Sequence, residues 1–226
     1  MITLSKMRSL ARKCRSTAGT ARRKVINTVG RARSRTSSAG IALTYDDGPD
    51  ENFTPALLDV LKEGGVTATF FVLGDRAVEH PAIVRRMVLE GHAVGSHSMT
   101  HPDFRRTAIS AVRRDVVASR DALQRITGAK VQLFRPPHGR LTLSAAAMLR
   151  FSGYRTWLWN VDSYDWKPGA SSDKVITNVA AAGPGDVVLF HDTKEHTVAA
   201  TRAIIAHFHE SGVPFVALGG DHSRAD

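Results

Sequence analysis

The chain has 226 residues, of which 42% are hydrophobic and 23% are charged. These fractions are those of a soluble globular protein, and the length suffices for one medium-sized domain with a full hydrophobic core. The formal net charge of +10 is typical of nucleic-acid-binding proteins, but residues 1–38 hold eleven of the 31 Lys and Arg and no acid, so the other 188 residues carry 20 basic and 21 acidic groups. We therefore expect no nucleic-acid partner for the domain itself.

Residues 1–39 are predicted to form a basic, flexible N-terminal tail. Its apolar residues recur at spacings of three and four (Leu4, Met7, Leu10 and Cys14), a pattern that predicts an amphipathic helix in contact with an anionic membrane surface. A transit peptide or a disordered solvated arm are the alternatives. Arginines interrupt every apolar run, so we predict neither a secretory signal nor a transmembrane segment and expect a cytoplasmic or membrane-peripheral location.

Residues 40–226 are predicted to form one α/β domain. Short segments rich in β-branched and aromatic residues, typical of strands, alternate with longer segments of helical periodicity. Strands are expected at 41–46, 68–74, 92–97, 131–135, 156–162, 186–191 and 214–218, and helices at 54–64, 80–91, 108–127, 142–153, 172–182 and 196–211. This alternation predicts a parallel sheet, either open or closed into a barrel.

Clusters of chemically reactive residues follow five of these strands. The segments are "TYDD" after the first strand, "HSMTH" after the third, "RPPH" after the fourth, "DSYDW" after the fifth and "LFHD" after the sixth. In parallel α/β barrels the loops after the strands share one face, where active sites are built. We therefore expect all five clusters to converge on one site.

His97 and His101 have the spacing that lets two imidazoles reach one metal ion. A lone histidine pair is more often structural or exposed, so this hypothesis depends on a third ligand. A nearby carboxylate such as Asp47 would complete a site with open positions for water and substrate. Such a site generates hydroxide near neutral pH and polarises a carbonyl group.

Asp46 and Asp47 bring two like charges into one site, which normally forces one carboxylate to stay protonated. A cation bound to one and an arginine beside the other would keep both ionised. Arg135 is the candidate arginine, in a loop stiffened by two prolines, and a structural salt bridge at the barrel rim is its alternative role. One aspartate would then bind the metal and the other would act as general base.

His191, at the end of an apolar strand, is the candidate acid for the leaving group, with its imidazole oriented by a carboxylate such as Asp165. A merely structural strand-end histidine is the alternative. Trp166 would either line a sugar pocket or cap the core. No role is assigned to the histidines expected at solvated positions, which are His80, His92, His196, His207, His209 and His222.

In this order the five segments resemble the motifs of the polysaccharide deacetylase family, also called carbohydrate esterase family 4 or the NodB homology domain. "TYDDGP" is similar to the family's T-F-D-D-G-P, "HSMTH" to H-[ST]-x-x-H, "RPPHG" to R-x-P-Y-G, "DSYDW" to D-x-x-D-W and "LFH" to L-x-H. The resemblance covers about residues 40 to 220. It implies a distorted (β/α)7 barrel with one divalent metal ion, most often zinc, with cobalt or another divalent ion as the alternative.

The resemblance also implies roles for individual residues. Carried over by position, Asp46 is the base, Asp47, His97 and His101 are the metal ligands, Arg135 holds Asp46, and Asp165 tunes the acid His191. Leu189 and Trp166 would line the pocket for the acetyl methyl, and the backbone N–H of His138 would help to hold the oxyanion. Tyr45, in place of the usual phenylalanine, would form an aromatic wall of the site, and His138 replaces the usual tyrosine.

The implied function is metal-dependent removal of N-linked acetyl groups from an N-acetylated amino sugar, such as a chitooligosaccharide, a peptidoglycan-type glycan or an N-acetylglucosaminyl metabolite. One alternative is an O-acetyl esterase acting on acetylated glycans. Another is a non-catalytic sugar-binding barrel whose tail docks on a membrane or on nucleic acid. The oligomeric state is not predicted.

Overall fold

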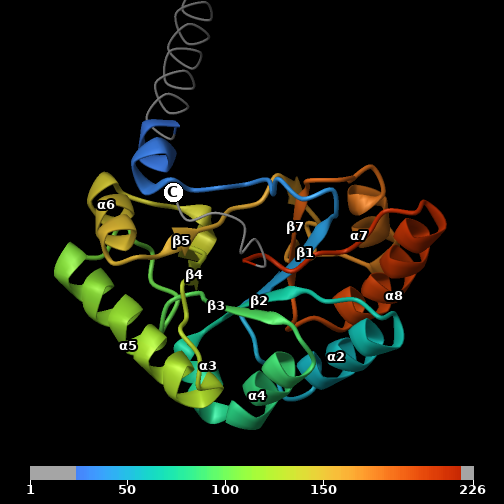
Figure 1. Cartoon of the computed structure of the whole chain (residues 1–226), viewed down its shortest axis with the longest axis horizontal. Coiled ribbons are helices and arrows are strands. Elements are labelled where there is room, and N and C mark those ends of the chain that lie inside the picture. The colour runs from blue at the N-terminus through green and yellow to red at the C-terminus, as the bar shows by residue number, and fades with distance from the viewer. Residues whose placement is uncertain (1–23, 220–226) are drawn as a thin grey trace, which may run out of the picture.

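Within residues 24–219, which the computed structural model describes, a seven-stranded parallel sheet forms the centre of the protein (Figure 1). The strands lie in the order β5-β4-β3-β2-β1-β7-β6. Their bounds are β1 Ala42–Asp46, β2 Thr69–Val72, β3 Ala93–Ser96, β4 Leu133–Phe134, β5 Arg155–Thr156, β6 Val161–Asp162 and β7 Val187–His191. The sheet curls so that β5 and β6 form its two edges, which confirms the predicted distorted (β/α)7 barrel.

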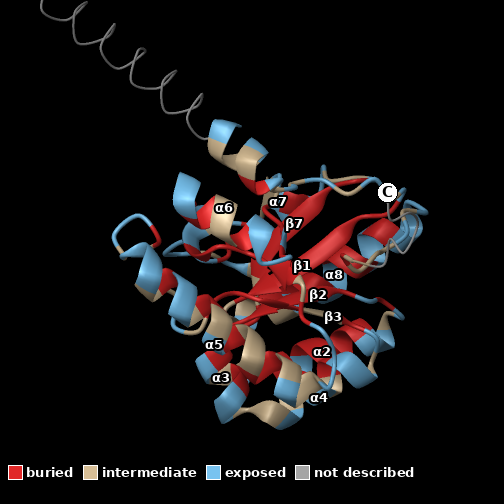
Figure 2. Ribbon diagram, turned by 60° about the vertical axis from the view of Figure 1, so that its left-hand side comes forward, coloured by how far each residue is buried: buried red, intermediate tan, exposed pale blue. Residues whose placement is uncertain are grey.

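Helices cover the outside of the curled sheet. In Figure 2 the buried residues of these helices, coloured red, lie on the side that faces the strands. The helices are α2 Thr54–Glu63, α3 Gly74–Glu79, α4 Pro81–Leu89, α5 Ile109–Thr127, α6 Leu143–Phe151, α7 Ser172–Val179 and α8 Glu195–Glu210, together with the 3₁₀ turn η1 Pro137–Gly139 and a helical stretch at 24–30. Local signals place several helix ends: the Thr142 and Ser171 side chains cap α6 and α7, and Gly128 ends α5 with φ 68°. The predicted helices are confirmed, but α3 was not predicted.

Two predicted strands differ from the structure. The segment 156–162 is not one strand, because Leu158 leaves the sheet: its carbonyl accepts a hydrogen bond from Arg135 and its N–H donates to the carbonyl of Arg33. The chain then joins the opposite edge of the sheet as β6. The segment 214–218 forms only a single bridge, between Phe215 and Ile41, instead of a strand.

The sheet separates two apolar layers. The larger layer fills the space between the outer face of the sheet and the helices, where Leu57 and Leu61 of α2 meet Ile204 and Phe208 of α8. Burying each such side chain contributes about 1.5–3 kcal/mol. A smaller cluster on the inner face includes Phe71. Both faces of the central sheet are therefore covered by packed apolar side chains.

Part of the expected tail contacts the domain. The N–H of Arg33 donates to the carbonyl of Thr156, and the N–H of Thr36 donates to the carbonyl of Gly185. We therefore propose that the domain begins before residue 33 and not at residue 40. The predicted membrane-contacting helix concerns residues 1–23, which lie outside the described part of the chain. None of the helices between residues 24 and 219 combines the length and apolar character of a membrane-spanning helix.

Candidate active site

The five predicted clusters meet at the carboxyl ends of the strands. Asp46 ends β1 and His191 ends β7, and these two residues are direct partners in the register of the parallel pair. A cavity of about 430 Å³ opens at this end of the sheet. Its lining consists of Asp46, Asp47, His97, His101, His138, Gly139, Arg140, Trp159, Asp162, Trp166, Leu189 and His191.

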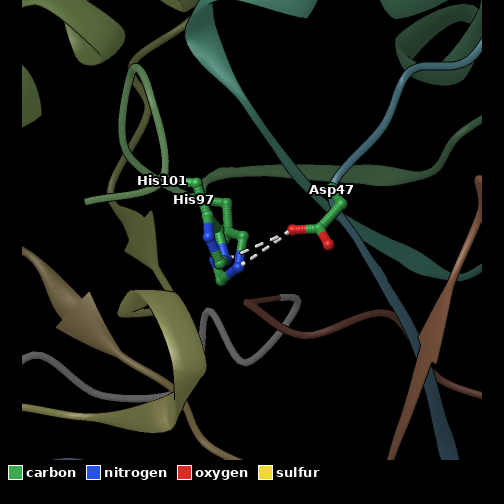
Figure 3. A group of neighbouring side chains, drawn as sticks. All are labelled: Asp47, His97 and His101. Carbon is green, nitrogen blue, oxygen red and sulfur yellow. Dashed lines mark ion pairs between the residues drawn. The ribbon is translucent and has the colours of Figure 1, made fainter. Parts of the chain in front are cut away.

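Asp47, His97 and His101 face one another at the edge of this cavity (Figure 3). The Oδ1 atom of Asp47 lies 3.4 Å from Nε2 of His97 and 3.5 Å from Nε2 of His101. Asp47 has φ 75°, so the chain leaves the extended conformation directly after Asp46. Because of this turn, the two neighbouring carboxylates reach the same site, although successive side chains of a strand point to opposite faces.

The geometry of this triplet fits a small divalent cation. Tetrahedral ligands about 2.0–2.1 Å from zinc lie roughly 3.3 Å apart, close to the observed separations. Burial lowers the pKa of His97 to about 3, and its Nδ1–H donates to the carbonyl of Arg135 at 2.8 Å, which leaves a neutral Nε2 facing Asp47. Oδ1 of Asp47 is buried and has no hydrogen-bond donor. An orphaned carboxylate oxygen between two imidazoles is the arrangement that a cation would satisfy.

Asp46 is paired with a fully buried arginine. Nη1 of Arg135 donates to Oδ1 of Asp46 at 2.7 Å and to Oγ1 of Thr44 at 2.8 Å, and Nη2 donates to the carbonyl of Leu158 at 3.1 Å. The guanidinium also lies over the ring of Phe71. Burial raises the pKa of Asp46 above its ordinary value, while the charge of Arg135 opposes the rise. Arg135 thus lies inside the barrel and not in a salt bridge at its rim.

Asp165 and His191 form a second buried pair. Oδ1 of Asp165 lies 2.7 Å from Nδ1 of His191, and Oδ2 accepts a hydrogen bond from the N–H of His191 at 2.7 Å. Burial alone would lower the pKa of His191, but the hydrogen bond and charge of Asp165 outweigh it and raise the pKa to about 9. The imidazole is therefore protonated at neutral pH. Its Nε2 points to Asp47, 3.9 Å from Oδ2.

Three other predicted residues lie on the cavity. Leu189 is buried in its wall, and Trp166 is 50% exposed at its rim, where its Nε1–H donates to Asp162 at 3.3 Å. The ring of His138 packs edge-on against that of His101, with centroids 4.5 Å apart.

The prediction that Tyr45 forms a wall of the site is wrong. Its side chain is completely buried between Phe70 and Phe190, with ring centroids 5.3 Å from each. The reason is strand alternation: Tyr45 precedes Asp46 in β1, so its side chain points to the helix-covered face while Asp46 points into the barrel.

Several residues around the site were not predicted from the sequence. Asp192 is buried behind it and accepts a hydrogen bond from Oγ1 of Thr54 at 2.7 Å, so close to Gly48 that a Cβ there would overlap its carboxylate. His196, expected at a solvated position, donates from Nε2 to the carbonyl of Asp165 at 2.9 Å. Thr197 donates to the carboxylate of Asp165 at 2.7 Å. Only the position of Asp192, next to His191 in "LFHD", could have pointed to one of them.

Comparisons with known proteins agree with this geometry. The family model described as polysaccharide deacetylase matches residues 33–157. A peptidoglycan-N-acetylglucosamine deacetylase of Bacillus cereus is 36% identical over 80% of this chain and 68% of its own length. A chitooligosaccharide deacetylase of Sinorhizobium fredii is 35% identical over 84% of this chain and 95% of its own. The crystal structure of the Bc1960 peptidoglycan N-acetylglucosamine deacetylase superposes with a TM-score of 0.79, at 35% identity, covering 83% of this chain and 90% of that one.

Proposed function

The chain belongs to the polysaccharide deacetylase family, and from this premise we propose that it is a metal-dependent hydrolase that removes N-linked acetyl groups from N-acetylated amino sugars. The observation that carries the proposal is the convergence of three units on one cavity. These are the candidate metal ligands Asp47, His97 and His101, the Asp46–Arg135 pair and the Asp165–His191 pair.

The triplet would hold one divalent ion, with zinc as the leading candidate and cobalt or another divalent ion as the alternative. A cation there would polarise the amide carbonyl and favour deprotonation of water. The ligand set supports the proposal, because two imidazoles and one carboxylate are typical of catalytic zinc sites that keep positions open for substrate.

Asp46 acts as the general base in this proposal. Burial raises its pKa, which strengthens it as a base. The hydrogen bond from Nη1 of Arg135 engages its Oδ1, while its Oδ2 lies 3.7 Å from Nε2 of the metal-ligand candidate His97. As water adds to the acetyl carbonyl carbon, Asp46 accepts one proton from it. The N–H of His138, in the turn after the two prolines, is proposed to stabilise the negative charge that develops on the carbonyl oxygen.

His191 acts as the general acid. Because its imidazole is protonated at neutral pH, it donates a proton to the amide nitrogen as the C–N bond breaks, which releases acetate and a free amine. Leu189 and Trp166 would contact the methyl group of the acetyl substituent. The partner of the site is thus an N-acetylated carbohydrate. Chitooligosaccharides and peptidoglycan-type glycans are the first candidates, because the relatives are named for these substrates.

The test is acetate release from a substrate panel. Zinc-loaded protein is incubated with N-acetylglucosamine, chitotetraose, peptidoglycan fragments and acetylated xylan, before and after chelation. We expect release from the N-acetylated glycans that stops on chelation and returns with added zinc. Asp46→Asn should be inactive yet bind zinc, and the surface variant Asp121→Asn should be fully active.

Any other result contradicts the proposed mechanism or favours one of the alternative functions. Activity that survives chelation, or that persists in Asp46→Asn, contradicts the mechanism. Release only from acetylated xylan favours the O-acetyl esterase. Binding of glycans without acetate release by the zinc-loaded protein favours the non-catalytic barrel.

A further inference from the structure

A chain of buried hydrogen bonds leads from β1 to the Asp165–His191 pair. Tyr45 lies in a slot of aromatic rings where a phenylalanine would pack equally well, so its hydroxyl needs a polar partner. That partner is Oγ1 of Thr201 on α8, at 3.0 Å, and both atoms are buried.

The direction of each hydrogen bond follows from the donors available. The hydroxyl proton of Thr201 is donated to the carbonyl of Thr197, one turn earlier on α8, at 2.9 Å. The Thr201 oxygen can therefore only accept from Tyr45. Burial raises the pKa of Tyr45, so its hydroxyl keeps the proton that it donates.

Thr197 then reaches the acid pair. Its hydroxyl donates to Oδ2 of Asp165 at 2.7 Å, the same oxygen that accepts from the N–H of His191. With Oδ2 held by two donors, Oδ1 is turned toward Nδ1 of His191. The neighbouring His196 fixes the backbone of Asp165 as well. The first turn of α8 thus determines both the position and the rotation of the carboxylate.

We propose that Tyr45, Thr201 and Thr197 are positioning residues that tie the strand of the base to the acid pair. Tyr45 is the neighbour of Asp46 in β1, and Thr197 binds the partner of His191. This series of hydrogen bonds therefore fixes the position of the base relative to the acid. It does so from the face of the sheet opposite the cavity. This inference rests on the proposed function, because it assigns Asp46 and His191 their roles in deacetylation.

The experiment compares variants that remove and restore single hydroxyls. Thr197→Val removes the donor to Asp165 while keeping the shape of the side chain, and Thr197→Ser keeps the donor. Tyr45→Phe removes the first member of the series. Thr177→Val is the control, because it makes the same substitution at an exposed position on α7, where the Thr177 hydroxyl donates to the carbonyl of Asp173 and not to a residue of the site.

We expect Thr197→Val to lower kcat on chitotetraose about tenfold with KM and zinc content unchanged, and Thr197→Ser to recover most of the loss. Tyr45→Phe should lower kcat about threefold. Because Tyr45 acts through Thr197, the double variant should be no slower than Thr197→Val alone. The control should match the wild type. Effects that multiply in the double variant, or a kcat unchanged by Thr197→Val, would overturn the proposal.

A second readout does not depend on activity. In zinc-free protein labelled with ¹⁵N-histidine, the Nδ1–H proton of His191 should give a downfield NMR signal because it is bound by Asp165. This signal should move or broaden in Thr197→Val and return in Thr197→Ser. An unchanged signal contradicts the positioning role. If the wild type releases no acetate from any substrate, the proposed function fails, while the NMR comparison still decides this inference.

Discussion

Replacing Arg135 by methionine tests the central pair of the site. Arg135→Met puts a long, unbranched apolar side chain in place of the arginine and so removes a fully buried guanidinium. Oδ1 of Asp46 and the carbonyl of Leu158 both lose a hydrogen-bond donor at a buried position. Breaking a buried ion pair by removing one partner costs about 3–5 kcal/mol, because an uncompensated charge stays behind. We expect this loss in the free energy of unfolding, measured by urea denaturation of zinc-free protein at pH 8.

The pH dependence of the loss identifies its cause. Burial already raises the pKa of Asp46, and without Arg135 the pKa rises further. A carboxyl group whose pKa is higher in the folded than in the unfolded state binds more protons when folded, so stability falls as the pH rises from its unfolded to its folded pKa. The cost of Arg135→Met should therefore be smaller at pH 5 than at pH 8.

A second substitution and a control complete this test. Adding Asp46→Asn removes the stranded charge, so the double variant should recover roughly 2 kcal/mol of the loss at pH 8. Arg125→Met, at an exposed position on α5, should change stability by less than about 0.5 kcal/mol. The reasoning is refuted if Arg135→Met costs less than about 1 kcal/mol, if the cost is independent of pH, or if the double variant recovers nothing.

Three further predictions follow from the site. Because Asp165 raises the pKa of His191 to about 9, the rate of acetate release should fall above that pH. Asp165→Asn should move this alkaline limb of the pH–rate profile to lower pH. A limb that stays in place argues against His191 as the acid. Zinc should raise the Tm of the wild type but not of His97→Gln, measured by differential scanning fluorimetry; an equal rise would remove His97 from the ligand set. Burial raises the pKa of Asp192 to about 7, so this group favours folding below its unfolded pKa and its contribution is lost as the pH rises toward 7. Asp192→Asn should therefore gain roughly 2 kcal/mol relative to the wild type between pH 5 and pH 8 in urea unfolding, and a constant difference would show that Asp192 does not titrate there.

Local patterns were sufficient for most of the fold. Apolar periodicity predicted the helices within a few residues, because each helix buries one face against the sheet. It did not predict α3, which at six residues is too short to show a helical period. Nor could it predict that 156–162 divides between two sheet edges, since this depends on Arg33 and Arg135 binding the backbone of Leu158 from elsewhere in the chain.

The site, too, was predicted from the sequence only in part. The polar clusters after the strands were predicted to converge, and they do, because parallel strands present all their carboxyl ends at one edge. Tyr45 was misplaced although strand alternation alone puts it opposite to Asp46. Thr197 and His196 were missed because their partner Asp165 lies about thirty residues away and a threonine or histidine on a helix carries no pattern of its own.

The sequence by itself determined the kinds of reactive group, their order and the end of the sheet where they meet, because these depend on residue type and on the alternation of strands and helices. The resemblance to the family motifs implied that Arg135 holds Asp46 and that Asp165 orients His191, but the geometry of these pairs was decided by the tertiary structure alone. It turns Asp47 beside Asp46 at φ 75°, buries Arg135 against one carboxylate, and brings α8 against Asp165. Each of these arrangements depends on contacts between residues distant in the chain, whose strength is set by burial and by hydrogen-bond geometry that no local pattern contains.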